Sequence, residues 1–201
     1  MGLQRKGAAP PTPGPRPLTV PLALMKNTAL AALLSLFALA GCSSLKPESF
    51  SSTTPVIDPV KFFGGHTHSA GVIESRSGQP SERITTQTAG VFANGILSME
   101  QDLHSEDSKP THRNFKFKII DAHHVDATGS DVVGTARGEL YGNYFTWSFQ
   151  LKVANKGLIH HVNMTQCMYL MPDGKTLIIR SIIRKFGIIV KEITEQFHKD
   201  D

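Results

Sequence analysis

Residues 143–151 read NYFTWSFQL, in which a large apolar side chain occupies every second position. The apolar set consists of Phe145, Trp147, Phe149 and Leu151. Successive side chains of a β-strand point to opposite faces, so this period of two predicts a strand with one face in a hydrophobic core. An amphipathic α-helix would instead place its apolar residues three and four positions apart.

The same alternation recurs on both sides of this stretch. Further segments that show it lie at residues 97–103, 115–119, 162–170 and 178–182. Clusters of Gly, Asn, Asp, Ser and Pro separate the segments, as expected for turns between antiparallel strands. The pattern predicts about eight to ten antiparallel strands joined by hairpins.

A sheet of this length would expose two edges, and closure into a barrel removes both. We therefore expect an all-β fold, an antiparallel, up-and-down, lipocalin-like barrel over residues 58–201. About eight strands leave an interior wide enough for side chains or one small ligand. One short N-terminal helix is expected at residues 58–63, with Asp58 as its N-cap and Pro59 in its first position. This helix would plug one end of the barrel.

The first 41 residues have a different character. Residues 1–24 are rich in Pro and Gly, and we interpret them as an upstream extension outside the mature protein, the alternative being a genuine N-terminal arm. Residues 25–41 begin with Met25 and Lys26 and continue into an apolar run at residues 28–40. The run is too short to span a bilayer comfortably and has the length of a signal-peptide core, so residues 25–41 are interpreted as a signal peptide.

The apolar run ends in Leu39-Ala40-Gly41-Cys42, which resembles the lipobox of bacterial lipoproteins. The resemblance implies cleavage before Cys42 and acylation of its thiol; the alternative is a chance cysteine after an ordinary cleavage site. About two acyl chains suffice for stable anchoring to a membrane. Ser43, where an Asp would imply inner-membrane retention, points to the periplasmic face of the outer membrane. Residues 42–57, rich in Ser, Thr and Pro, are expected to be a flexible tether.

Charge and cysteine content exclude other classes of protein. Residues 1–41 hold four of the 21 Lys and Arg and none of the 17 Asp and Glu, so the remaining chain has 17 of each kind. A domain without net charge offers no electrostatic case for a nucleic-acid partner. The chain has two cysteines. Acylation of Cys42 leaves Cys167 without a disulfide partner, as a packed thiol rather than a nucleophile.

Short motifs in a fixed order run through the domain. They are Phe62-Phe63-Gly64, Gly71, Ser75-Arg76-Ser77-Gly78, Val133-Gly134-Thr135-Ala136, Gly138, Gly142-Asn143, Met168-Tyr169-Leu170, Arg180 and Lys185-Phe186-Gly187. Together with the lipobox they resemble a family of Gram-negative lipoproteins known only as a domain of unknown function. The chain departs from that family where Gln166-Cys167 stand in place of a Trp and acidic residues. The resemblance implies a location and a lipocalin-like fold, but no activity.

Two polar side chains are candidates for ligand binding. Arg180 lies among four isoleucines within residues 178–183. Facing inward, it would be a buried cation able to bind an anionic head group; facing outward, it would be solvated, and the sequence leaves both open. Gln166 lies between two methionines on an expected core face and is a second candidate.

The histidines include three close pairs, at residues 66 and 68, 123 and 124, and 160 and 161. Two histidines at i and i+2 share a strand face and can begin a metal site, but the site needs a third ligand from another strand. No sequence feature supplies that ligand. We therefore favour surface histidines and predict no metal, no cofactor and no catalytic residue.

These observations favour a non-enzymatic envelope lipoprotein whose barrel binds or shields an apolar, lipid-like ligand. One alternative is an envelope enzyme that uses histidine or Arg180 in the barrel. Another is a structural or assembly partner without a ligand. The enzyme requires polar side chains that converge on one pocket, whereas the assembly partner requires an exposed apolar patch.

Overall fold

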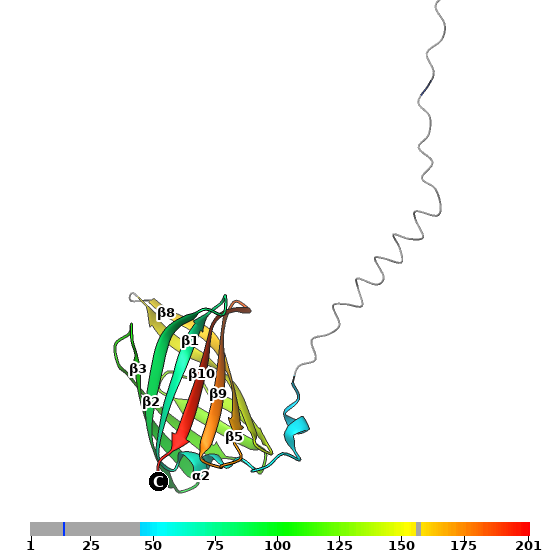
Figure 1. The fold of residues 1–201 in the computed structure, drawn as a ribbon, viewed down its shortest axis with the longest axis vertical. Helices are drawn as coiled ribbons and strands as arrows, with labels where there is room; N and C mark the ends of the chain where they lie inside the picture. Colours follow the sequence, from blue (N-terminus) through cyan, green and yellow to red (C-terminus); the bar gives the residue numbers. More distant parts are fainter. Residues whose placement is uncertain (1–13, 15–44, 156–157) are drawn as a thin grey trace, which may run out of the picture. The chain divides into compact units, whose positions relative to one another are not determined.

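The computed structural model describes residue 14 and residues 45–155 and 158–201 of the 201-residue chain. Ten antiparallel strands close into a barrel, in which consecutive strands pair and β10 closes against β1 (Figure 1). The strands are β1 (Gly65–Ser75), β2 (Pro80–Ala93), β3 (Ile96–Ser105), β4 (Thr111–Ile119), β5 (His124–Gly129), β6 (Ala136–Tyr141), β7 (Tyr144–Asn155), β8 (Leu158–Leu170), β9 (Thr176–Lys185) and β10 (Ile188–Lys199). The predicted all-β, up-and-down barrel is confirmed.

The apolar faces of the strands fill the barrel interior. Phe145, Trp147 and Phe149 of β7 are 0%, 4% and 7% exposed. Phe117 of β4 packs against Trp147, with ring centroids 5.0 Å apart. The alternate residue Ser148 is exposed on the outer surface. The inward face that the alternation predicted for residues 143–151 is therefore the core of the barrel.

Helix α2 (Pro59–Phe63) plugs one end of the barrel, as predicted. Its N-cap Asp58 accepts hydrogen bonds from the backbone N–H groups of Val60 and Lys61. Phe63 points inward, with its ring centroid 6.2 Å from that of Phe197. The backbone of β2 passes close beneath it, because a Cβ on Gly90 would lie 1.9 Å from the Phe63 carbonyl oxygen. A side chain at this position of β2 would push the helix out of the barrel.

The segment before α2 is docked on the barrel rather than extended, which corrects the expected flexible tether. The short helix η1 (Pro47–Phe50) places Phe50 on Tyr144 of β7, with ring centroids 4.5 Å apart. Thr53 Oγ1 donates a hydrogen bond to the Asn143 side-chain oxygen at 2.7 Å. The N–H of Ile57 donates to the Gly142 carbonyl at 2.8 Å. The folded unit accordingly begins at Leu45 and not at residue 58.

The expected leader lies outside the described residues. This applies to the upstream extension at residues 1–24 apart from residue 14, to the signal peptide at residues 25–41 and to Cys42 with its acyl chains. These assignments stay predictions. No helix within the described parts of the chain has the length and apolar character needed to cross a bilayer.

The two ends of the barrel differ. One end, which we call the closed end, holds α2, the C-terminus and the β2–β3, β4–β5, β6–β7 and β8–β9 connections, at the bottom of the barrel in Figure 1. The opposite end, which we call the mouth, holds the β1–β2, β3–β4, β5–β6, β7–β8 and β9–β10 connections. Neither of the two helices in the described chain lies at the mouth.

Replacement of the core residue Phe145 by Ala should lower the free energy of unfolding by about 3–5 kcal/mol, because it leaves a cavity among large rings. The matched control is Phe186→Ala in the β9–β10 turn, where the side chain is 91% exposed. That change should alter stability by no more than about 0.5 kcal/mol. Urea unfolding followed by circular dichroism measures both, and similar losses in the two variants would contradict the assigned core.

Candidate functional site

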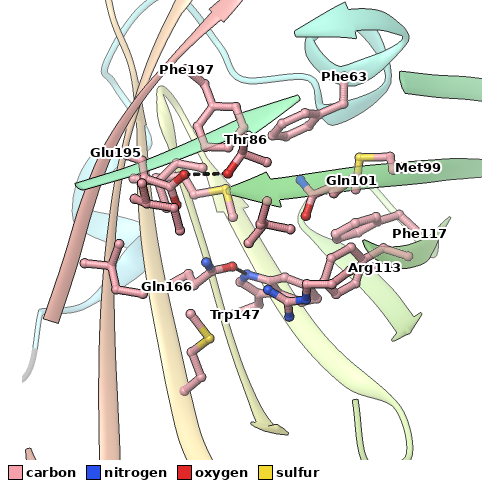
Figure 2. Close-up of a pocket in the computed structure, with 17 residues that line it drawn as sticks. Phe63, Thr86, Met99, Gln101, Arg113, Phe117, Trp147, Gln166, Glu195 and Phe197 are labelled. Carbon is pink, nitrogen blue, oxygen red and sulfur yellow. Dashed lines mark hydrogen bonds between the residues drawn. The ribbon is translucent and has the colours of Figure 1, made fainter. Parts of the chain in front are cut away.

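A cavity of about 70 Å³ lies inside the barrel, between α2 and the mouth. Its wall is mostly apolar, as Figure 2 shows for several of its residues. The apolar lining includes Phe63, Met99, Phe117, Trp147, Met164 and Phe197. Five polar side chains interrupt this wall, namely Thr86, Gln101, Arg113, Gln166 and Glu195. These five decide what the cavity can bind, since a polar group in an apolar wall needs a partner.

Gln166 faces the cavity, as expected from its position between two methionines. Its side-chain oxygen accepts a hydrogen bond of 2.6 Å from Trp147 Nε1, drawn as a dashed line in Figure 2. Its Nε2 donates to Ser181 Oγ at 2.8 Å. Both ends of the amide are thus engaged with β7 and β9, so Gln166 orients the indole and ties three strands together. Its predicted role in ligand binding stays a prediction.

Glu195 of β10 is the buried carboxyl of the cavity, with 8% of its surface exposed. Ser69 Oγ of β1 donates a hydrogen bond to Glu195 Oε1 at 2.8 Å. Thr86 Oγ1 of β2 donates to the same oxygen at 2.9 Å, which Figure 2 marks as a dashed line. The other oxygen, Oε2, has no hydrogen-bond partner among the described residues. A carboxyl with one bound and one free oxygen therefore faces the cavity.

Burial raises the pKa of Glu195 above its ordinary value of 4.5 because the charged form loses its hydration. The hydrogen bonds from Ser69 and Thr86, and the charge of Arg113, oppose this rise only in part. Relative to water, the protein environment shifts the carboxyl towards its neutral form. When the carboxyl is protonated, Oε1 already accepts two hydroxyl hydrogen bonds, so the proton belongs on Oε2, where it can be donated into the cavity.

Gly71 of β1 makes room for this carboxyl. It is the direct cross-strand partner of Glu195 in the pair that closes the barrel. A Cβ at Gly71 would lie 2.6 Å from Glu195 Cγ and 2.3 Å from the Thr194 carbonyl oxygen. Any side chain at this position would displace Glu195 from its present place, so the missing side chain is part of how the site is built.

Arg113 of β4 lies between the cavity and the mouth, and both hollows include it in their walls. Its guanidinium carbon lies 4.9 Å from the centre of the Phe115 ring. Its Nε lies 2.6 Å from Asp131 Oδ2, so the two side chains form an ion pair. Three of their buried atoms make no well-aligned hydrogen bond to a described group, namely Arg113 Nε, Arg113 Nη2 and Asp131 Oδ1. The Arg113 guanidinium, which lies where the cavity adjoins the mouth, is therefore paired with the Asp131 carboxylate but retains N–H donors for another polar group.

The mouth is a second hollow, of about 480 Å³. Ile84, Leu103 and Arg113 line both this hollow and the inner cavity, so the two adjoin. At its rim Lys191 Nζ donates to Glu82 Oε1 at 3.1 Å. Hydrogen bonds from Ser105 and Lys191 hold the pKa of Glu82 below its usual range. The mouth thus presents mixed charges around an apolar passage to the interior.

Comparison with known proteins places the chain in a family. The family model described as "Protein of unknown function (DUF3833)" matches residues 36–199. The chain belongs to this family. Among curated proteins there is no match.

Among solved structures, the S-type phycobiliprotein lyase of Guillardia theta is similar to this chain. The TM-score is 0.53 with 8% sequence identity, and the match covers 79% of this chain and 99% of the lyase chain. At this identity the likeness concerns the fold alone. It agrees with the predicted lipocalin-like barrel, and the family carries that fold without an assigned activity.

Arg180 does not reach the cavity, so of the two placements that the sequence left open the outward one is found, and its candidacy for ligand binding inside the barrel is wrong. Its side chain is 54% exposed on the outer face of β9 and donates to Glu192 of β10. The neighbouring Ser181 faces the interior instead and is 1% exposed. Because successive side chains alternate between faces, Arg180 is excluded from the interior by the same geometry that buries Ser181. An anionic head group inside the barrel therefore has no partner in Arg180.

The described histidine side chains do not converge on the cavity. His68 and His124 bind acidic neighbours on the outer surface, and His112 lies at the rim of the mouth. Within the described residues, no three His, Cys, Asp or Glu side chains are grouped so that they could hold a metal ion. The histidines that the enzyme alternative would use are thus not gathered at the cavity in the described part of the barrel, although other polar side chains line it.

The sequence reasoning missed Glu195 and Arg113. Glu195 lies between Ile193 and Phe197 at a period of two, and Arg113 precedes Phe115 by two positions. Both are charged residues in register with an apolar strand face. The alternation of apolar residues continues into the last strand, where it includes Glu195, and two residues before Phe115, where it includes Arg113. Both positions could therefore have been predicted to face the interior.

Glu195→Gln should gain stability relative to the unchanged protein as the pH rises. Because the folded-state pKa of Glu195 is raised above the unfolded value of 4.5, the folded protein holds this proton more tightly, and its stability falls as the pH rises through and beyond 4.5. Glutamine has no proton to lose and escapes that fall. Urea unfolding at pH 5 and pH 8 measures the difference.

The control is Glu106→Gln, whose stability relative to the unchanged protein should stay constant between pH 5 and pH 8. The hydrogen bond from Arg83 lowers the pKa of Glu106, so the stability that this carboxylate contributes is lost only as the pH falls below 4.5 and is fully present at both measured pH values. Glu106→Gln should therefore differ from the unchanged protein by the same margin at pH 5 and pH 8, and the margin should be small because the pair is exposed. A Glu195→Gln variant whose stability difference is the same at both pH values would contradict the shifted carboxyl.

Proposed function

We propose that this protein is a lipid-anchored envelope protein whose barrel binds a small, uncharged, mostly apolar molecule through one hydrogen-bonding oxygen. The anchor is the acylated Cys42, on the periplasmic face of the outer membrane. The ligand enters through the mouth, and its oxygen accepts a hydrogen bond from Glu195. The protein performs no chemistry on the ligand in this proposal.

The observation that carries the proposal is the free oxygen of Glu195. Oε2 is not one of the fully enclosed side-chain atoms that lack a partner, so it opens onto the cavity, where a ligand can reach it. Gly71 leaves room for the carboxyl at the closing pair of the barrel. A ligand oxygen placed at Oε2 completes the hydrogen bonding of the buried acid. Polar groups of this kind, few and well placed in an apolar wall, are typical of small-molecule sites.

The charge state of the carboxyl selects the ligand class. A neutral acid with its proton on Oε2 donates to a carbonyl, ether or hydroxyl oxygen. A cationic ligand would require ionised Glu195, which burial opposes. A carboxylate ligand would require an uncompensated buried cation, and the charge of Arg113 is already balanced by Asp131, although Arg113 retains donors. An uncharged oxygen-bearing ligand accepts from neutral Glu195 and requires no charged partner in the wall.

The dimensions limit how the ligand is held. Typical ligand pockets measure about 300–1,000 Å³, whereas the inner cavity has about 70 Å³. The cavity therefore receives only the oxygen-bearing end of the ligand, and the adjoining mouth of about 480 Å³ holds the rest. Met99, Met164 and Met168 line the cavity, and flexible thioether side chains adapt readily to a guest.

The lipid anchor rests on the sequence around Cys42. When the full chain is expressed in a Gram-negative host, its mass should show loss of the residues before Cys42 and addition of acyl chains, and it should fractionate with the membrane. The control Cys42→Ser should carry no acyl mass and remain in the soluble fraction. An unacylated Cys42 in the processed protein would contradict the anchor.

Ligand binding can be followed by the fluorescence of Trp147, which lines the cavity and is the chain's single tryptophan. The probe is 2-octanone, whose ketone is both a hydrogen-bond acceptor and a quencher of indole emission. Saturable quenching is expected. Glu195→Leu should weaken the affinity about tenfold, the equivalent of one hydrogen bond, whereas Glu195→Gln keeps a donor and should stay within about threefold.

Arg180→Gln is the matched control, because this side chain lies outside the barrel. It should leave the affinity for 2-octanone unchanged. Quenching that never saturates, or equal affinity in the unchanged protein and Glu195→Leu, would contradict binding at this carboxyl. Circular dichroism of each variant shows whether the barrel is intact.

A further inference from the structure

Large apolar side chains are exposed at the closed end of the barrel. Val91 and Phe92 at the end of β2 are 67% and 48% exposed. Ile120, in the β4–β5 connection, is 49% exposed. Ile96, the first residue of β3, and Ile119, the last residue of β4, border the β2–β3 and β4–β5 connections and are 36% and 38% exposed. The pairing of β2 with β3 and of β3 with β4 brings these connections to one side of the closed end.

A hollow of about 450 Å³ adjoins these side chains. Pro59 and Val60 of α2 form one part of its wall, and Phe92 and Ile119 form another. Val56, in the segment that leads into α2, is 69% exposed nearby in the sequence. Contiguous apolar surface with a hollow in it is rare on monomers unless something binds there.

The docked segment fixes where an anchored chain meets the barrel. Pro47, the first residue of η1, is only five residues after Cys42. Those five residues span at most about 18 Å when fully extended. The helix itself packs on β6 and β7 beside the β6–β7 turn, which belongs to the closed end. An acylated Cys42 is therefore held near the closed end and not near the mouth.

The barrel is longer than this reach. Strand β2 has 14 residues, which at the usual rise and tilt corresponds to a barrel height of about 35 Å. With the mouth against the membrane, the closed end would stand farther from the lipid than about 18 Å of chain can cover. A membrane holding the acyl chains of Cys42 is thus excluded from contact with the mouth in an upright barrel.

Charge supplies no alternative explanation for this surface. Asp58 and Asp121 line the hollow, and Lys118 lies on β4 beside it, so the closed end has no excess of basic residues. Attraction to anionic lipid headgroups would require such an excess. The contact is instead made by apolar side chains inserted among the headgroups and upper acyl chains, as in interfacial membrane binding.

The geometry points to the closed end as a lipid-contacting surface, with Phe92 and Ile120 inserted into the bilayer that holds the acyl chains and the mouth directed away from it. This inference rests on the proposed acylation of Cys42. It adds an orientation that acylation alone does not supply, since a long flexible tether would leave the barrel free to rotate.

Two exposed phenylalanines at opposite ends provide the test. Phe92→Trp places a fluorophore at the closed end, and Phe186→Trp places one at the mouth, where the native side chain is 91% exposed. The full acylated chain is reconstituted in phosphatidylcholine vesicles with and without bromine atoms on the acyl chains. Bromine quenches tryptophan only at close range, and buried Trp147 contributes the same background to both variants.

The brominated vesicles should reduce the emission of the Phe92→Trp protein and leave that of the Phe186→Trp protein at the level of the unchanged chain. Ile120→Trp should behave like Phe92→Trp and serves as a second probe if the first variant folds poorly. Quenching of Phe186→Trp, or equal emission from all variants in both kinds of vesicle, would overturn the orientation.

Flotation of the same vesicles separates the two proposals. A protein that floats with the vesicles but shows no quenching at residue 92 or 120 is anchored without this surface, which overturns the orientation alone. A protein that carries acyl chains on Cys42 and floats with quenching at these residues supports both. A protein without acyl chains that stays in solution overturns the anchor and the orientation together.

Discussion

The pairing of β10 with β1 is the constraint on which the rest of the structure depends. It closes the barrel, and it places Gly71 directly opposite Glu195. Closure removes the sheet edges and assigns every side chain to the interior or the outside. At the closing pair this assignment puts a carboxyl inside, where Ser69 of β1 and Thr86 of β2 satisfy one of its oxygens. The polar character of the cavity is thus a consequence of how the last strand meets the first.

The alternation of side chains predicted most of the fold and only part of the site. It gave the correct inner faces for residues 143–151 and 162–170, because each has one apolar and one polar face. It could not orient Arg180, because β9 is apolar on both faces and a period of two then carries no information about the side. There the inner face is set by Ser181, which bonds Gln166 across the sheet. A side-chain hydrogen bond between two paired strands depends on their register, which no local pattern contains.

The segment before α2 illustrates a second limit. Its Ser, Thr and Pro content predicts a flexible chain, since composition reports the average behaviour of such residues. Its order comes from a few specific contacts: Phe50 covers Tyr144, and Thr53 bonds Asn143. Tyr144 lies on the face of β7 opposite Phe145, and an outward tyrosine next to a sharp turn offers a flat apolar surface that a neighbouring aromatic ring can cover. Docking shortens the free chain after Cys42, and this changes what an anchor would do to the barrel.

The proposed orientation and the proposed ligand constrain each other. If the closed end contacts the anchoring bilayer, the mouth opens to the aqueous compartment, and a ligand must cross water to enter. A long-chain lipid would arrive slowly by that route and would not fit an inner cavity of about 70 Å³. A small uncharged molecule with one polar oxygen dissolves sufficiently in water. It can enter the cavity between Ile84, Leu103 and Arg113, and its oxygen can accept a hydrogen bond from Glu195. Two independent features, the short tether and the small polar-ended cavity, therefore favour the same class of ligand and argue against extraction of lipid from the membrane that holds the protein.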